Sequence, residues 1–445
     1  MRETSTAQTS LFDFYAPHER SIFLRDLSDR LDQHPELYRI VESDVLRKSG
    51  KNTGRQGLSI ESIFRCMLLK QIFRISYAQL SFQLTDSPTY RSFSRLDRHC
   101  FPSKSTLCTN IRRLRPETLR AVFEQLGADC LARGEMETQA MRLDSTVIKS
   151  NIAPPSDSRL LDDGIRVLSR LMAKSVERTG VKLRLTDYRK ASRKLAAAIF
   201  YGKKAEKDAL YCELIPLARR VVKQSHVAVE QVRDKIIDPL AFCWIDEVVH
   251  YRQLLERVID QAERRVFHNE TVPASEKIVS LFEPHTDIIV KGKRDVEYGH
   301  KINLSTNRDG LITVVMLEKG NPKDSERFIP LLETHQRLYG KLPETTIADG
   351  CYASHGNVSA AKEMGVEKVA FHKKNGITLR EMGIQEKTLK KLKNFRAGIE
   401  ANISELKRAF GAGKALWKGE SGFAAFVWAS VISYNLAHLV RMQSG

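Results

Sequence analysis

The strongest constraint on the fold of this chain is a change of hydrophobic period near residue 285. Beyond it, short β-like runs alternate with helical runs, which predicts an α/β or mixed sheet. We expect strands at 288–290, 298–304, 311–317, 345–348 and 368–371, and helices at 325–338 and 389–410. A further strand at 140–148 is separated from these by a mostly helical stretch, 156–285.

The first part of the chain, residues 20–135, has the pattern of a run of short helices. Ser76 and Gln79 form a capping box that opens one of them. A third helix is expected to start near Ser103 or Ser105 and to carry the basic residues Arg112, Arg113 and Arg115. Two short helices followed by a basic one are typical of a helix-turn-helix. Spacing alone leaves a generic helical bundle with a solvated basic face as the alternative.

The charge of the chain indicates a polyanionic partner. Its 445 residues include 72 Lys and Arg and 54 Asp and Glu, which gives a net charge of +18. Nucleic acid is the first candidate for such a partner, and an anionic membrane surface is the second. Because 42% of the residues are hydrophobic and 28% are charged, the composition is that of a globular protein and excludes a disordered chain.

The cysteines and the apolar segments favour a reducing compartment and no membrane partner. Seven scattered cysteines cannot all pair, which favours free thiols and a cytoplasmic location. Residues 1–17 lack the apolar core of a signal peptide. The uncharged stretch 421–440 is near the minimum length of a membrane span, but it contains several polar side chains. We therefore expect it to form a helix buried in the protein core.

Two aspartates at the ends of expected strands are candidate catalytic residues. Asp144 lies in the strand at 140–148, and Asp349 directly follows the strand at 345–348. Aspartate is a poor strand residue, and a carboxylate at a buried strand end is costly unless it binds something. A turn or helix-capping role is the alternative for either aspartate taken alone.

A third carboxylate, Glu400, lies on the helix expected at 389–410. At about 100° per residue, Arg396, Glu400 and Lys407 share one edge of this helix, beside an apolar face that would dock on the sheet. Strand-end carboxylates could therefore meet Glu400 there. An ordinary solvated i,i+4 pair of Arg396 with Glu400 is the alternative.

Three such carboxylates would suit metal-dependent phosphodiester chemistry. Clustered carboxylates repel one another, and hard divalent cations with oxygen ligands relieve that repulsion. Two Mg²⁺ ions about 3.5–4 Å apart can activate an attacking oxygen and stabilise the leaving oxygen. The segment 368–418, which contains Glu400, has thirteen Lys and Arg and four Asp and Glu. Such a basic surrounding would hold the phosphates of a nucleic acid.

These motifs resemble those of bacterial DDE-type insertion-sequence transposases, and most of all the ISNCY-like group. The resemblance covers about residues 35–440 and rests on Gly57-Leu-Ser59, Leu68-Leu-Lys70, Ser76-Tyr-Ala-Gln-Leu80, Tyr90-Arg-Ser-Phe93, Ser105-Thr-Leu107, Leu143-Asp-Ser-Thr146, Tyr298-Gly-His-Lys301, Ala348-Asp-Gly-Cys-Tyr352 and Arg396-x3-Glu400-x6-Lys407. Two positions depart from the family pattern. Lys393 stands where a tyrosine often precedes the arginine, and Gly350 directly follows the second aspartate.

The resemblance implies a mixed α and β fold with three parts. We expect an all-helical N-terminal DNA-binding domain with helix-turn-helix character at 1–135 and an RNase H-like α/β catalytic domain at 136–440, interrupted by a long helical insertion at 156–285. Asp144, Asp349 and Glu400 are the implied catalytic residues and ligands of two Mg²⁺ ions, for which Mn²⁺ could substitute. The residues expected to contact DNA are Arg396, Lys407, Lys301, His300, Lys393, Arg112 and Arg113.

The implied function is transposition of DNA. The chain would bind the terminal inverted repeats of its element as a homodimer or higher oligomer, cleave DNA in a Mg²⁺-dependent reaction, and transfer the 3′-hydroxyl to target DNA. Its expected location is the bacterial cytoplasm, associated with the nucleoid. Two alternatives stay open. One is an RNase H-like DNA nuclease without strand transfer, and the other is a catalytically inactive DNA-binding repressor derived from a transposase.

Overall fold

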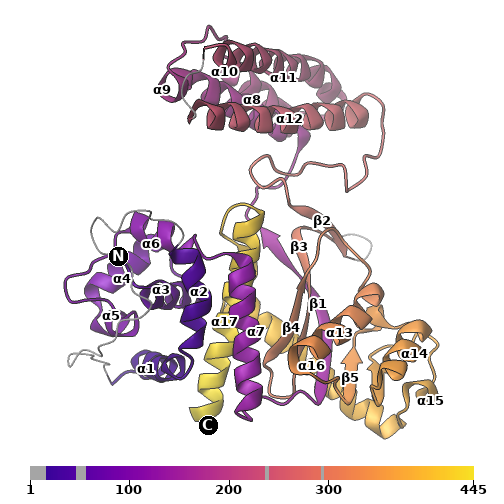
Figure 1. Cartoon of the computed structure of the whole chain (residues 1–445). Coiled ribbons are helices and arrows are strands. Elements are labelled where there is room, and N and C mark those ends of the chain that lie inside the picture. The colour runs from indigo at the N-terminus through magenta and orange to yellow at the C-terminus, as the bar shows by residue number, and fades with distance from the viewer. Residues whose placement is uncertain (1–16, 47–56, 236–239, 292–294, 445) are drawn as a thin grey trace. The chain divides into compact units, whose positions relative to one another are not determined.

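The computed structural model describes residues 17–46, 57–235, 240–291 and 295–444, which belong to two compact units (Figure 1). One unit contains the chain up to Ser150 and again from Gly299 onward. The other unit is Asn151–Tyr298. The second unit has a hydrophobic core of its own, so the long segment between the first strand and the rest of the sheet packs on itself.

The first unit begins with a series of helices. They are α1 (Glu19–Asp32), α2 (Glu36–Val45), α3 (Ile60–Ile72), α4 (Tyr77–Asp86), α5 (Pro88–Phe93), α6 (Lys104–Ile111) and α7 (Pro116–Ala132). Serine hydroxyls satisfy backbone N–H groups at the starts of α3, α4 and α6. Ser76 and Gln79 form the predicted capping box at the start of α4.

The sixth helix ends sooner than the sequence spacing predicted. Its last residue is Ile111, so Arg112 and Arg113 lie in the exposed turn that follows and not on the helix. Pro116 starts α7, and a residue before proline is disfavoured in the helical conformation. Arg115 accordingly has an extended backbone. The prediction of a basic third helix is therefore wrong, whereas the helix-turn-helix assignment stays a prediction.

Within the described residues, seven strands form one mixed sheet. They are β1 (Ala140–Ser150), β2 (Asp287–Lys291), β3 (Asp295–Thr306), β4 (Ile312–Leu317), β5 (Thr345–Ala348), β6 (Lys368–Phe371) and β7 (Lys414–Ala415). The order is β2-β3-β1-β5-β6, with β4 paired to β3 and β7 to β1. β3 runs antiparallel to β1 and β4, while β5 runs parallel to β1 and β6. This arrangement confirms the mixed sheet and is consistent with an RNase H-like domain.

Helices cover both faces of the sheet. On one face lie α16 (Glu386–Arg408) and α17 (Glu420–Ser444), whose apolar side chains pack with Ile148 and Ile302. On the other lie α13 (Phe328–Tyr339) and α14 (His355–Met364), which pack with Leu143 and Val314. The short elements η1 (Asp324–Arg327), η2 (Gly350–Tyr352) and α15 (Leu379–Met382) complete this part. Because both faces are covered, most residues of β1 are buried.

The last helix, α17, is a core helix, as predicted. By length and composition it could cross a membrane, but 89% of its apolar window is buried inside the protein. It packs against α7 and α3, and Figure 1 shows α7 and α17 side by side. One apolar cluster joins Leu68 of α3, Leu304 of β3 and Val427 of α17. The N-terminal helices and the sheet therefore share one core.

The second unit is mainly helical. Its helices are α8 (Asp157–Ala173), α9 (Ser175–Thr179), α10 (Arg189–Tyr201), α11 (Lys204–Arg233) and α12 (Leu240–Val266). Leu161 of α8, Leu214 of α11 and Leu255 of α12 are fully buried in the core between these helices. The unit therefore buries its own apolar surface, and its exposed faces are left for other roles.

Candidate active site

The register of the sheet brings Asp144 beside Asp349. β1 and β5 are parallel neighbours, and Leu143 pairs with Ala348. Asp144 follows Leu143 in β1, and Asp349 follows Ala348 at the end of β5. The two aspartates therefore lie side by side on neighbouring strands. Asp349 has an extended backbone and is followed directly by the turn η2. The two predicted aspartates are therefore neighbours although more than 200 residues separate them.

The helix α16 is fixed over β1 by a buried arginine. Arg142 of β1 donates three hydrogen bonds of 2.7 Å, to Thr306 Oγ1 on β3, to the carbonyl of Phe395 and to Asn402 Oδ1 on α16. Hydrogen bonds from a charged donor are stronger than those between neutral groups. Arg142 therefore sets the position of α16 on the sheet, and with it the position of Glu400.

One guanidinium, that of Arg396, contacts all three predicted carboxylates. Its Nη2 lies 2.7 Å from Asp144 Oδ2 and 3.6 Å from Asp349 Oδ1, and its Nη1 lies 2.5 Å from Glu400 Oε1. The Arg396 side chain is 10% exposed and that of Glu400 is 64% exposed. The pair on α16 is thus not merely a solvated i,i+4 pair, because its arginine is buried against the strand-end aspartates.

The surroundings of Asp144 hold its pKa well above the ordinary value. The pKa of Asp144 is raised to about 6, mainly because burial deprives the charged carboxylate of solvation. Arg396 and the Ser145 backbone N–H act to lower this pKa, whereas Asp349 and Glu400 act to raise it. When all three acids are ionised, Arg396 balances only one of three negative charges. The site therefore has an excess of negative charge that additional cations would neutralise.

A fourth carboxylate, Asp324, lies on the opposite side of β1. Successive strand residues point to opposite faces, so Ser145 points away from the Asp144 side. Its Oγ donates to Asp324 Oδ2 at 3.1 Å. Lys301 Nζ lies 2.5 Å from Asp324 Oδ1. Sequence reasoning missed Asp324. Its one signal was its place as an acidic residue at the start of a short helix. Its partners could not be predicted, because the pairing of β1 with β3 decides that Ser145 and Lys301 lie together.

A buried polar chain supports the turn after Asp349. Tyr352, which is fully buried, donates from its hydroxyl to Asn303 Oδ1 at 2.6 Å. Asn303 Nδ2 in turn donates to Glu318 Oε1 at 2.8 Å. Buried polar networks of this kind fix geometry when every member is satisfied. Tyr352 therefore anchors to β3 the turn that begins directly after Asp349.

The other predicted DNA contacts lie at three places. Lys407 and Lys393 are partly buried on α16, and Lys407 shares the helix edge of Arg396. Lys301 and His300 are buried on β3. Lys301 forms an ion pair with Asp324, and the His300 ring packs edge-on against the Phe423 ring with centroids 4.7 Å apart. Arg112 and Arg113 are exposed before α7. Among the predicted DNA contacts, Arg396 of α16 is the residue whose described ion pairs reach the three carboxylates.

A separate cluster of potential ligands involves His34, Glu36 and Asp129. Within the described residues, this is the group of His, Cys, Asp and Glu whose ligand atoms all lie within 4.8 Å of one another. His34 Nδ1 lies 3.1 Å from Asp129 Oδ2 and 3.2 Å from Glu36 Oε1, which are ordinary hydrogen-bond distances. The three predicted catalytic carboxylates are more widely spaced, because the Arg396 guanidinium lies among them.

Two family models match separate segments of the chain. A model described as Transposase DDE domain matches residues 284–436, and one described as Transposase domain (DUF772) matches residues 13–113. No curated protein and no solved structure matches the chain. The first match contains Asp349 and Glu400, and the strand pairing of β1 adds Asp144 to them. The closer likeness to the ISNCY-like group stays a prediction. The resemblance to the wider family is confirmed, and the chain belongs to the DDE-type insertion-sequence transposases.

Proposed function

We propose that this transposase binds the terminal inverted repeats of its own element, cleaves DNA there, and joins the freed 3′-hydroxyl to target DNA. The family supports DNA as the substrate and a DNA-cleaving or DNA-transferring reaction. A net charge of +18 supports binding to a polyanion. Asp144, Asp349 and Glu400 are the residues that we assign to the chemistry.

The observation that carries this proposal is the convergence of three carboxylates on Arg396. They come from β1, from the end of β5 and from α16. All the donor atoms are carboxylate oxygens, which Mg²⁺ and Mn²⁺ prefer, and one guanidinium does not balance their charge. We infer that Asp144, Asp349 and Glu400 would hold two Mg²⁺ ions, or Mn²⁺ as a substitute. When bound, such ions activate the attacking oxygen and stabilise the leaving oxygen of a phosphodiester.

The side chains of α16 would orient the DNA strand. A guanidinium binds a phosphate through two parallel hydrogen bonds, so Arg396 is assigned to the phosphate next to the reacting bond. Lys393 and Lys407 lie on the same helix and add positive charge for neighbouring phosphates. Lys301 has a different task in this proposal, since it holds Asp324 and thereby supports β1 and β3.

The N-terminal helices would recognise the ends of the element. Arg112 and Arg113 are exposed and available for phosphates, and a helix of this region would enter the major groove. Because two ends must be held together before they are joined to a target, we infer a homodimer or a higher oligomer on DNA. We place this activity in the bacterial cytoplasm, on the nucleoid.

The test is a cleavage assay with labelled DNA that carries the presumed end of the element, in the presence of Mg²⁺. We expect nicking at the end and joined products with the unaltered protein, and neither with Glu400→Gln. The matched control is Glu405→Gln on the same helix, which removes an equal charge from the pair with Arg441.

Each result of this assay has a distinct meaning. Nicking without joined products would indicate a nuclease. Tight binding without nicking by the unaltered protein would indicate a DNA-binding repressor. Equal activity of the Glu400→Gln and unaltered proteins would overturn the assignment of the site.

A further inference from the structure

One face of α10 in the second unit combines positive charge with exposed aromatic rings. At about 100° per residue, six side chains of this helix fall within about 140° of one another. They are Arg189, Lys190, Arg193, Lys194, Phe200 and Tyr201, and all six are exposed. The opposite side of α10 is formed by Ser192, Ala196 and Ile199, which are buried against the rest of the unit. We refer to the six exposed residues as the α10 face.

The aromatic rings of the α10 face have little cover from the protein. Phe200 is 66% exposed and Tyr201 is 85% exposed, and their rings meet edge-on with centroids 5.0 Å apart. Two large rings that stay in water do not gain the free energy of apolar burial. Contiguous exposed apolar groups of this kind mark binding surfaces. The π-face of such a ring can stack on any nucleobase.

The positive charge of the second unit is concentrated around this helix. Residues 151–298 contain 27 Lys and Arg and 22 Asp and Glu, a surplus of five. Residues 182–207 alone contain nine Lys and Arg and two Asp and Glu, a surplus of seven. The remainder of the unit is therefore slightly acidic. Arg189 forms an ion pair with Asp187 at 2.7 Å. The ion pairs of the described residues include none of Lys190, Arg193 and Lys194, so these three cations are available for an external partner.

A basic groove borders the start of α10. It has a volume of about 300 Å³ and is lined by Arg184, Arg220 and Lys223, together with apolar residues that include Tyr188. Tyr188 is the residue directly before α10, so the groove adjoins the α10 face along the chain. No Asp or Glu lines it. A groove with three cations and no carboxylate is suited to phosphate groups.

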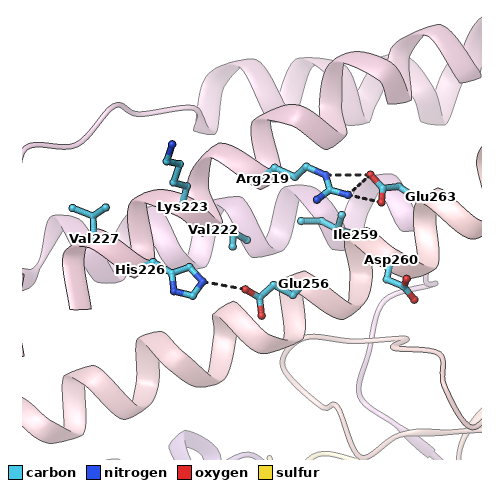
Figure 2. Close-up of a pocket in the computed structure, with 9 residues that line it drawn as sticks. All are labelled: Arg219, Val222, Lys223, His226, Val227, Glu256, Ile259, Asp260 and Glu263. Atoms are coloured by element: carbon cyan, nitrogen blue, oxygen red, sulfur yellow. Dashed lines mark hydrogen bonds and ion pairs between the residues drawn. The ribbon is translucent and has the colours of Figure 1, made fainter. Parts of the chain in front are cut away.

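The larger groove between α11 and α12 has a different character. Figure 2 shows Arg219 facing Glu263 and His226 facing Glu256, while Lys223 points away from these pairs. Arg219 lies 2.6 Å from Glu263, and His226 lies 3.3 Å from Glu256. Its charges are therefore largely paired within the protein, and it has no excess that would attract an anion. The contrast singles out the α10 face as the polyanion-binding part of this unit.

We propose that the α10 face and its adjoining groove form a second DNA-binding surface of this transposase, in which the cations bind phosphates and the Phe200–Tyr201 pair stacks on an unpaired base. This inference rests on DNA being the substrate under the proposed function but not on the carboxylate site. From Arg189 to Tyr201 the helix extends about 18 Å, enough to follow several nucleotides of one strand. Protein partners fit less well, because a surface with four clustered cations would require an acidic counterpart.

The test measures DNA binding of the full chain as a function of salt. The charge variant changes Arg189, Lys190, Arg193 and Lys194 to Ala, and the matched control changes Lys174, Arg178, Arg233 and Lys235, which are exposed elsewhere on the same unit, to Ala. Each lost phosphate contact reduces the magnitude of the slope of log affinity against log salt concentration by about 0.9. We therefore expect the magnitude of this slope to fall by about 3 to 4 in the charge variant and by less than about 1 in the control.

The ring variant changes Phe200 and Tyr201 to Ala and is measured with two probes. One is a duplex of arbitrary sequence, and the other is the same duplex with a short central stretch of unpaired bases. We expect affinity for the unpaired probe to fall by about tenfold, with a much smaller loss for the intact duplex. Circular dichroism and thermal unfolding of each variant establish that the helices remain folded.

Three outcomes would overturn the inference. The first is an equal salt slope for the charge variant and its control. The second is an equal loss of affinity of the ring variant for both DNA probes. The third is that the ring variant dissociates an oligomer without any change in DNA binding. Failure of the proposed function is separable from these. If Glu400→Gln still nicks DNA, the carboxylate assignment fails, while the salt slopes still decide the α10 face.

Discussion

At the scale of single residues, Arg396 lies among the three carboxylates to which we assign cation binding. Its two terminal nitrogens contact Asp144, Asp349 and Glu400, which would otherwise repel one another. A guanidinium cannot supply the Lewis acidity of a metal ion, but it stabilises the carboxylates in its absence. Under the proposed function, divalent ions would compete with Arg396 for the same oxygens, and the guanidinium would then be available for a DNA phosphate.

This competition predicts the behaviour of Arg396→Met. Without metal, the variant should lose about 3 kcal/mol of unfolding free energy, because the largely buried carboxylate of Asp144 loses its partner. Its affinity for Mn²⁺ should rise about tenfold, because a competing cation is gone. Calorimetry with Mn²⁺, without DNA, measures the affinity, and thermal unfolding with and without Mn²⁺ measures the rescue of stability.

The control for this prediction is Lys390→Met on the same helix. Lys390 is exposed, so the variant removes the same charge from α16 without touching the carboxylates. We expect its Mn²⁺ affinity and stability to stay close to those of the unaltered protein. Weaker Mn²⁺ binding by Arg396→Met than by Lys390→Met would contradict the competition.

A second residue-scale prediction concerns His335 in α13. Burial lowers the pKa of His335 to about 4, and its Nδ1 lies 3.1 Å from the carbonyl of Lys341. The unfolded chain, with a pKa near 6.5, binds the proton more tightly than the folded chain. The stability contributed by neutral His335 is therefore complete above pH 6.5 and is lost as the pH falls from 6.5 toward 4.

The measurement compares the unaltered protein with His335→Asn, which keeps an N–H donor and cannot titrate. Urea unfolding at pH 7 and pH 5 should show the unaltered protein losing about 2 kcal/mol more than the variant. A parallel loss in both proteins would show that His335 does not carry this pH dependence.

At the scale of elements, the seating of α16 on β1 decides whether Glu400 reaches the aspartates. Arg142 bonds to both sides of this contact, and Gly398 is the residue of α16 that lies above it. A Cβ at Gly398 would lie 2.1 Å from Arg142 Nη1. The absence of a side chain there allows α16 to approach the sheet, which explains a helix-weakening residue two positions before Glu400.

Gly398→Ala therefore tests the seating of α16. Helix propensity alone would make alanine stabilising by about 1 kcal/mol, but the clash with Arg142 should reverse the sign and destabilise by about 1–2 kcal/mol. Displacement of Glu400 should lower the nicking rate by at least about tenfold. Urea unfolding and the cleavage assay measure the two effects.

The chain offers a matched control in Gly356 of α14. A Cβ at this helical glycine would have Ser354 Oγ at 3.9 Å as its nearest neighbour, so Gly356→Ala should be neutral or stabilising. If Gly398→Ala also stabilised the protein and kept full nicking, the close approach of α16 to Arg142 would not be needed.

At the scale of the whole molecule, we expect the N-terminal helices and the sheet to unfold as one unit, because they share a core. Phe123 of α7 packs on Trp428 of α17 with ring centroids 5.4 Å apart. The same apolar cluster continues into Ile312 of β4. Recognition of DNA by the N-terminal part and chemistry at the sheet would thus be mechanically linked through α17.

Phe123→Ala tests this linkage. Loss of a buried phenylalanine should cost about 3 kcal/mol. Amide hydrogen exchange should become faster in α7, α17 and β4 together, while α11 and α12 of the other unit stay protected. The control, Val248→Ala in the core of the second unit, should give the reverse pattern. Faster exchange confined to the N-terminal helices would contradict a shared core.

Much of this protein follows from its sequence alone. The strands other than β7, the capping box at Ser76 and the buried character of α17 come from contiguous residues, because hydrophobic period and capping are local properties. The basic helix predicted for Arg112 was wrong although Pro116 carried the signal that ends it. Asp144 and Asp349 stood out as unfavourable at strand ends, and the family motifs singled them out together with Glu400 as candidate catalytic residues.

What only the tertiary structure decided are the partners of those residues. Pairing of β1 with β5 sets Asp144 beside Asp349, pairing of β1 with β3 turns Lys301 toward Asp324, and Arg142 fixes α16 above them. The helical wheel indicated that Glu400 could meet the strand-end carboxylates, but sequence spacing did not reveal the strand pairing, because a unit that folds on itself separates β1 from β5. The period of a strand tells which residues share a face, but the neighbour that the face meets is chosen by the packing of the whole chain.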